Sequence, residues 1–243
     1  MKTIISLTSI PSRFNTLGTI LKDLLKQKCI DEIWVSIPKK YNRFPDVKVE
    51  IPDEIYEIDE KIKIKRCDDY GPGTMYMSPT LHSDADLIIV VNDDTKYPDN
   101  LSTELINAYK SDNCCWCLSG FKIDEYIQEN GKVKYINNNE VDVTESYGGV
   151  ILERNWIKQI LDEFNELYKF TYNDDVIIGN LFSKYKIKKK VLCTLECNIG
   201  HIQQYQFGFT KDALFYNNGE GSHYENNKRI FNEFKKHNIF YFV

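Results

Sequence analysis

The sequence lacks the features of a membrane or secreted protein. No apolar run approaches the roughly 20 residues that a helix needs to span a bilayer. Residues 1–7 contain too few apolar positions for a signal segment, and no small-residue cleavage site follows them. We therefore expect a soluble, cytoplasmic protein. Residues 239–243 are all apolar or aromatic; we expect them to pack on the body of the protein or on a partner, with peripheral membrane contact as the weaker alternative.

A strongly basic surface is also missing. The 31 Lys and Arg are outnumbered by 36 Asp and Glu, which gives a formal net charge of −5, and the longest basic run covers only residues 188–190. Nucleic acid is therefore not the expected partner. No Pro-, Gly- or Ser-rich linker and no internal repeat divides the 243 residues, so we expect a single domain over residues 1–243.

Disulfide spacing is absent as well. The seven cysteines are an odd number and lie mostly inside apolar runs, a pattern that favours a reducing compartment. Cys114, Cys115 and Cys117 are close together but have no second ligand pair at zinc spacing. We predict that this segment is a buried strand rather than a metal or redox cluster.

Strands and helices alternate in the first half of the chain. Apolar runs predict strands at residues 3–7, 33–37, 62–66 and 86–91, and apolar residues at helical spacing predict helices at 17–25 and 101–109. This order predicts an α/β fold with a mostly parallel sheet and right-handed crossovers. Ligands of such sheets bind beyond the carboxyl ends of the strands, where we expect the loops after the first, third and fourth strands to converge.

The second half changes character. Alternating stretches at 121–126 and 132–136 predict an antiparallel hairpin, which would make the sheet mixed. Helical spacing predicts further helices at 156–167 and 176–185.

Two adjacent carboxylates, Asp93 and Asp94, follow the apolar strand at 86–91. Unpaired carboxylates this close repel each other, and a divalent cation relieves the repulsion while also binding a diphosphate. The segment therefore indicates metal-assisted phosphate chemistry. An ordinary acidic turn after a buried strand is the alternative.

Four segments in order, at residues 6–13, 69–72, 92–98 and 172–176, resemble those of GT-A fold glycosyltransferases, similar to the compact family 2-like enzymes of bacterial and large-virus genomes. The resemblance implies a Rossmann-like sheet flanked by helices. It implies transfer of a hexosyl or deoxyhexosyl group from a nucleotide sugar, more often UDP-linked, to a glycan or glycoprotein acceptor. It also divides the domain into a nucleotide-binding half (1–110) and an acceptor-binding half (111–243).

The resemblance assigns a donor site to the first half. Asp94 matches the carboxylate that holds Mn²⁺ or Mg²⁺, Asp93 is a helper, and Asn92 stands where the family usually has an acid. The late His223 is the candidate third ligand, with His201 as its rival. The remaining predicted nucleotide contacts are Thr8, Ser9, Arg13, Asp69, Tyr70 and Gly71.

The family's usual lysine shortly after the Gly-Pro pair is absent, because Gly73, Thr74 and Met75 follow Pro72. A cation that faces the diphosphate must then come from elsewhere in the chain. Arg13 and Lys96 are the candidates.

A second acidic pair, Asp174 and Asp175, opens the predicted helix at 176–185. In inverting enzymes of this fold, a pair at this place supplies the general base, commonly its second member, so we expect Asp175 to be the base. Neighbouring carboxylates raise a pKa, and a helix amino terminus lowers it. The alternative is an ordinary acidic helix cap formed by Asn173, Asp174 or Asp175.

Residues 145–150 lie between the two acidic motifs and resemble the wall that contacts donor and acceptor. Tyr147 is placed to stack on a sugar ring and Glu145 to bind hydroxyls. Gly148 and Gly149 either let the backbone approach a sugar or form a bulge without ligand contact.

Other functions fit the sequence less well. A phosphohydrolase needs a nucleophilic Asp after the first strand, where Thr8 and Ser9 stand, and a nucleotidyltransferase needs a Gly-rich phosphate loop that is absent. A retaining glycosyltransferase would keep the metal site without the base. A non-catalytic carbohydrate-binding or scaffold protein is favoured by Asn92 and Met75.

Overall fold

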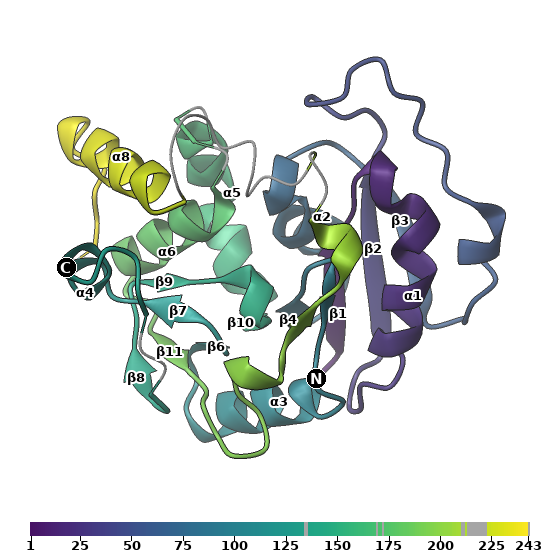
Figure 1. Cartoon of the computed structure of the whole chain (residues 1–243), viewed down its shortest axis with the longest axis horizontal. Coiled ribbons are helices and arrows are strands. Elements are labelled where there is room, and N and C mark those ends of the chain that lie inside the picture. The colour runs from purple at the N-terminus through teal and green to yellow at the C-terminus, as the bar shows by residue number, and fades with distance from the viewer. Residues whose placement is uncertain (134–135, 169, 172, 210–211, 213–222, 243) are drawn as a thin grey trace.

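The computed structural model describes residues 1–243 except 134–135, 169, 172, 210–211, 213–222 and 243. Its centre is an eight-stranded, mostly parallel sheet with helices on both faces, and two small antiparallel pairs lie beside it (Figure 1). The predicted α/β class is confirmed. No helix among the described residues is long and apolar enough to cross a bilayer.

Four neighbouring strands of this sheet are parallel. They are β3 (Ile62–Cys67), β2 (Glu32–Pro38), β1 (Thr3–Thr8) and β4 (Leu87–Val90), and each lies within one residue of its predicted ends. Ile5 of β1 pairs with Ile33 on one side and with Ile89 on the other. Because the four strands point the same way, their carboxyl ends meet at one edge of the sheet.

The rest of the sheet is mixed, as predicted. The strand β10 (Val150–Glu153) runs antiparallel to both β4 and β6 (Cys115–Cys117). Beyond β6 lie β11 (Lys189–Val191), parallel to it, and β8 (Asn139–Glu140), antiparallel to β11. The cysteine-rich segment is therefore a buried strand, and its cysteines are free thiols.

The helices divide between the two faces of the sheet. Ile5 and Leu7 of β1 pack in the cluster that contains residues of α1 (Phe14–Leu24) and α3 (Leu101–Ser111), whereas Ile4 packs in the other cluster. That second cluster contains residues of α2 (Thr74–His82), α5 (Arg154–Leu167), α6 (Asp174–Lys184) and α8 (His223–Lys236). Each fully buried Leu or Ile contributes about 1.5–3 kcal/mol.

The hairpin predicted at 121–126 and 132–136 is wrong. The structure has a short helix, α4 (Ile123–Gln128), in its place. Ile123 and Tyr126 lie three positions apart and are both buried, so the helical period matches the apolar pattern as well as the alternating one does.

The turn expected within that hairpin instead ends α4. Asn130 and Gly131 have positive φ angles of 51° and 85°, and the Gly131 N–H donates to the Tyr126 carbonyl at 2.7 Å. The antiparallel pair in this region joins β7 (Gly120–Phe121) to β9 (Val143–Thr144), which is more distant in sequence.

Helix α2 was not predicted. It follows a 3-10 turn at Gly71–Gly73 and contains Pro79 near its end. Every residue from Thr74 to Thr80 is buried, so this helix has no polar face and the apolar period that marks a surface helix is missing.

The apolar carboxyl terminus packs on the body of the protein. The Phe240 and Phe242 rings contact the ring of Phe231 in α8 edge to face. Asn180 of α6 is fully buried and holds the segment from both sides: its amide donates to the Ile239 carbonyl and accepts from the Tyr241 N–H, each at 2.8 Å.

Asn180→Ala tests this docking. The substitution leaves a partly buried carbonyl and a partly buried N–H without partners, and we expect the free energy of unfolding to fall by about 2 kcal/mol. Urea denaturation measures the change. Asn165→Ala on the exposed side of α5 serves as the matched control, and a loss for Asn180→Ala no larger than for that control would contradict the assignment.

Candidate functional site

A cavity of about 600 Å³ opens at the carboxyl ends of the parallel strands. The loops after β1, β3 and β4 converge there as predicted, and the loop after β2 joins them. Segments from the second half of the chain form the remaining walls. Ten of the predicted site residues line the cavity: Thr8, Ser9, Arg13, Asp69, Gly71, Asn92, Asp93, Asp94, Asp174 and Asp175.

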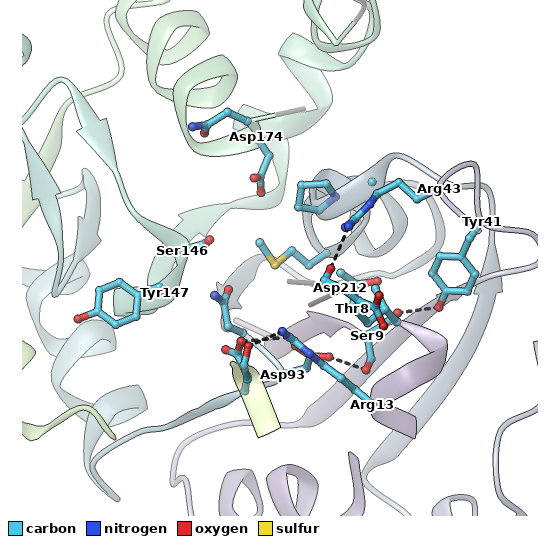
Figure 2. A pocket seen from close by; sticks show the side chains of 18 of the residues that line it. Thr8, Ser9, Arg13, Tyr41, Arg43, Asp93, Ser146, Tyr147, Asp174 and Asp212 are labelled. Carbon is cyan, nitrogen blue, oxygen red and sulfur yellow. Dashed lines mark hydrogen bonds and ion pairs between the residues drawn. The ribbon is translucent and has the colours of Figure 1, made fainter. Parts of the chain in front are cut away.

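One arginine holds both carboxylates at the end of β4. Arg13 Nη1 lies 2.5 Å from Asp93 Oδ1 and 3.1 Å from Asp94 Oδ2 (Figure 2). Ser9 donates its hydroxyl hydrogen to Asp93 Oδ2 at 2.5 Å. All three charged side chains are buried. Arg13 therefore supplies part of the positive charge that the sequence analysis assigned to a metal ion, and its guanidinium is engaged within the protein.

Burial and neighbouring charge oppose each other in this cluster. Burial lowers the pKa of Arg13, but Asp93 and Asp94 outweigh it and raise the pKa above its ordinary value. Burial raises the pKa of Asp93; Arg13 and Ser9 act against this effect, whereas the charge of Asp94 adds to it. One guanidinium between two carboxylates leaves one formal negative charge at this wall.

A late segment of the chain covers Asp94. The strand β12 (Gln203–Gln204) pairs with β5 (Thr95–Lys96), and the Tyr205 N–H donates to the Asp94 carbonyl at 2.8 Å. Gly208 packs so closely that an added Cβ would lie 2.8 Å from Asp94 Cβ. The Gly208 carbonyl also accepts from Arg13 Nη2 at 3.1 Å. This segment therefore fixes both ends of the ion pair.

The side chain that reaches Asp94 from this late segment is Gln204, with its Nε2 3.5 Å from Asp94 Oδ2. The predicted ligand His223 begins α8, and its side chain lies outside the described part of the structure. Its rival His201 is exposed in a 3-10 turn and does not line the cavity. Among the described residues, no group of three or more His, Cys, Asp or Glu side chains could hold a metal ion.

The loops of the nucleotide half are tied to one another. Thr8 donates its hydroxyl hydrogen to the Ser36 carbonyl at 2.7 Å, and the Tyr41 hydroxyl donates to the Ser9 carbonyl at 2.6 Å. Asp69 accepts from the backbone N–H of Asn42 at 2.6 Å and from that of Gly71 at 2.8 Å. These bonds preorganise the wall on which the sequence analysis placed the nucleoside.

Gly71 and Tyr70 have different roles in this wall. Gly71 has a φ of +55°, and an added Cβ would lie 1.7 Å from the Tyr168 hydroxyl oxygen, so only glycine fits there. Tyr70, a predicted nucleotide contact, does not line the cavity; its partly buried ring packs against the core.

The second acidic pair lies on the opposite wall. Asn173 caps α6 by accepting from the Val176 N–H at 3.1 Å, so neither aspartate is needed as the cap. Asp175 Oδ1 accepts from the Ser146 N–H at 3.0 Å. Asp174 is only 6% exposed, yet its Oδ2 has no hydrogen-bond partner among the described residues. Figure 2 shows this carboxylate pointing into the cavity from the side opposite Arg13 and Asp93.

Burial without a cation makes these carboxyl groups weak acids. Burial raises the pKa of Asp174 to about 7. Burial, followed by the charges of Asp174 and Glu145, raises the pKa of Asp175 well above its ordinary value. Burial also raises the pKa of Glu145, whose Oε2 accepts the hydroxyl hydrogen of Ser119. These carboxyl groups therefore hold their protons more tightly than exposed carboxyl groups do.

Gly148 and Gly149, which follow Tyr147 in the chain, allow close packing within the protein. An added Cβ on Gly148 would lie 2.6 Å from the Ser119 backbone nitrogen, and Gly149 has a φ of +75°. Neither glycine lines the cavity. Tyr147 does line it, but Figure 2 shows its ring directed away from Arg13 and Asp93. The ring is not positioned to stack over the centre of the cavity.

Several lining residues were missed from sequence. Tyr41 and Arg43 belong to the loop after β2, and Gln204, Gly208 and Asp212 belong to the late segment. Neither segment carries a motif. The only signal was the position of residues 41–44 just past the end of a predicted parallel strand, where ligand-binding loops gather.

Comparisons with known proteins agree with the fold. No family model and no curated protein matches the chain. Among solved structures, 221 chains match it. One is the crystal structure of S. aureus TarS 1-349 in complex with UDP, with a TM-score of 0.53 and 12% sequence identity over 79% of this chain and 58% of that chain. This chain thus spans less than two thirds of that structure's length. The likeness shows a Rossmann-like α/β fold.

Asp174→Asn is expected to stabilise the protein above pH 7. Because the pKa of Asp174 is raised on folding, the folded state binds its proton more tightly, and this contribution to stability, complete below about pH 4, is lost as the pH rises through about 7. Asparagine has no titrating carboxyl group at this position, so it avoids this loss of stability. Urea denaturation should show a gain of more than about 1 kcal/mol at pH 8 and little change at pH 4.

Asp99→Asn on the surface is the control for loss of one negative charge. If Asp174→Asn and the wild type are equally stable at pH 8, the carboxylate is not buried and uncompensated as described.

Proposed function

We propose that the protein is a glycosyltransferase that moves a sugar from a nucleoside-diphosphate donor, with UDP as the expected nucleotide, to a hydroxyl group of a glycan or glycoprotein acceptor. One observation carries this proposal. A single cavity at the carboxyl ends of the parallel strands has an Arg-bound carboxylate pair on one wall and an uncompensated carboxylate pair on the opposite wall. Sugar transfer needs a site for the diphosphate leaving group beside a base for the acceptor.

The donor half of the proposal rests on the preorganised wall formed by the loops after β1, β2 and β3. Hydrogen bonds between these loops already hold them, so a nucleoside binding there meets a wall that needs little ordering. The structurally similar TarS was solved in complex with UDP, which supports a nucleotide as ligand. Arg13 and Ser9 contribute indirectly, because both hydrogen-bond the Asp93 carboxylate and hold it in place.

The residues around Asp94 fit a divalent cation whose remaining ligands come from the donor. Asp93 is bonded through both oxygens, whereas the described residues give the Asp94 carboxylate only longer contacts, to Arg13, Thr95 and Gln204. The wall keeps one negative charge after Arg13, and carboxylate oxygens are the ligands that Mg²⁺ and Mn²⁺ prefer. We propose that Asp94 holds such an ion, which when bound offsets negative charge on the departing diphosphate.

We propose Asp174, rather than the expected Asp175, as the general base. Asp174 Oδ2 has no hydrogen-bond partner among the described residues and points into the cavity, and its pKa of about 7 suits proton transfer at neutral pH. Asp175 is bonded to the Ser146 N–H, and burial and neighbouring charges raise its pKa well above its ordinary value. Asp174 would take the proton of the acceptor hydroxyl while the hydroxyl oxygen attacks the anomeric carbon from the face opposite the diphosphate. This attack inverts the configuration at the anomeric carbon.

A non-catalytic scaffold is the weaker alternative. Asn92 and Met75, which favour it, do line the cavity. A buried, unpartnered carboxylate costs stability, however, and a protein that only binds sugars has no need to retain it.

Thermal-shift measurements with nucleoside diphosphates test the donor and the metal together. At about 100 times its Kd, UDP with Mn²⁺ should raise the Tm by about 5 °C or more. Asp94→Asn should retain most of the shift that UDP gives without Mn²⁺ and lose the increment that Mn²⁺ adds. Asp99→Asn, a surface change of the same charge, should behave as wild type. No stabilisation by any nucleoside diphosphate would contradict the proposed function.

Turnover of Asp174→Asn and Asp175→Asn tests the assignment of the base. Removing the base should lower kcat by about 10²–10⁴-fold in Asp174→Asn while the Kd for UDP stays within about twofold. In Asp175→Asn, kcat should fall less, because the Asp175 carboxyl neighbours the proposed base but does not take the proton itself. The reverse order would restore Asp175 as the base, and near-normal turnover in both variants would exclude the inverting mechanism.

A further inference from the structure

The cavity is rich in acids and poor in cations. Among the described residues, its lining contains seven acidic residues and two basic ones, Arg13 and Arg43. A nucleoside diphosphate is itself an anion, and the carboxylates that remain ionised repel it. The cavity therefore needs a positive charge that carboxylates do not already neutralise.

Arg13 does not meet this need. Its guanidinium nitrogens contact Asp93, Asp94 and the Gly208 carbonyl, and the side chain is buried. Releasing it for a ligand would leave two buried carboxylates without their cation, which is strongly destabilising. The other candidate from sequence, Lys96, does not line the cavity.

Arg43 is differently placed. It lies at the exposed rim, stacks on the Phe44 ring at 5.0 Å, and donates from Nη2 to the Asp212 backbone carbonyl at 2.9 Å. The described residues give it no ion pair with a carboxylate. Because a guanidinium has five N–H donors, most of its hydrogen-bonding capacity remains for a ligand. Figure 2 shows it reaching into the cavity from the rim, on the opposite side from Arg13 and Asp93.

The loop that carries Arg43 is fixed on both sides of that residue. Tyr41 is buried and bonded to the Ser9 carbonyl, and the Asn42 N–H is bonded to Asp69. The ring of Phe44 packs on that of Tyr41 at 6.2 Å, edge to face. The guanidinium is therefore presented from a rigid base, as a preorganised anion site requires.

We propose that Arg43 binds the diphosphate of the donor and replaces the lysine that this chain lacks after Pro72. The proposal rests on the proposed function. A planar guanidinium matches two phosphate oxygens at once, so Arg43 contributes geometry as well as charge. The diphosphate then lies between Arg43 and the wall that carries Asp94, while the nucleoside contacts the loops after β1 and β3.

Isothermal titration with matched ligands tests this role. Uridine, UMP and UDP, and the corresponding guanosine series, are titrated into the wild type, Arg43→Gln and Arg43→Lys. For the nucleotide that wild type binds, Arg43→Gln should weaken the diphosphate by about 10- to 100-fold and leave the nucleoside within about twofold. The diphosphate affinity of Arg43→Lys should lie between those of the wild type and Arg43→Gln, since lysine keeps the charge but cannot contact two phosphate oxygens in the planar geometry of a guanidinium.

Lys40→Gln is the matched control, because Lys40 is exposed in the same loop and does not line the cavity. An equal loss in this variant would mean that only the general field was changed. Equal losses of nucleoside and diphosphate binding, or diphosphate affinity within twofold of wild type, would overturn the role of Arg43 while leaving the proposed function standing. If wild type binds no nucleoside diphosphate, both proposals fall.

Discussion

Two carboxylates at the end of one buried strand set the main constraint on this structure. Asp93 and Asp94 cannot both be ionised and buried without a cation, and Arg13 meets most of that demand. The solution joins distant parts of the chain, because the same arginine also binds the Gly208 carbonyl. The ion pair therefore fixes where the late segment crosses the strand ends, and with it the shape of the cavity.

The opposite wall holds its acidic pair, Asp174 and Asp175, without an arginine partner among the described residues. Asn173 caps α6 and Ser146 bonds Asp175, so Asp174 is held in place while its Oδ2 has no hydrogen-bond partner among the described residues. Burial without compensation destabilises the fold, and the raised pKa is the sign of that cost. The two walls thus hold the same chemical group differently: Arg13 pairs with both carboxylates of one wall, whereas the described residues give the carboxylates of the other wall no such cation.

Sequence reasoning succeeded where the signal was local. Strand patterns in the sequence predicted four strands within one residue, and acidic pairs at a strand end and a helix start predicted two walls of one cavity. It failed where tertiary context decided the outcome. Helix α2 is buried on all sides, Ile123 and Tyr126 fit two periods, and nothing local distinguishes Arg43 or Gln204 from surface residues. The engagement of Arg13 by both aspartates also depends on contacts 80 or more residues away in sequence.

The central claim is that the two walls face the two ends of one nucleotide-sugar donor. A crystal structure of the protein with UDP and Mn²⁺ tests it most directly. We predict the uridine against the loops after β1 and β3, the diphosphate between Asp94 and Arg43, and Asp174 facing the position of the transferred sugar. A nucleotide bound outside this cavity, or a diphosphate turned toward Asp174, would contradict the account.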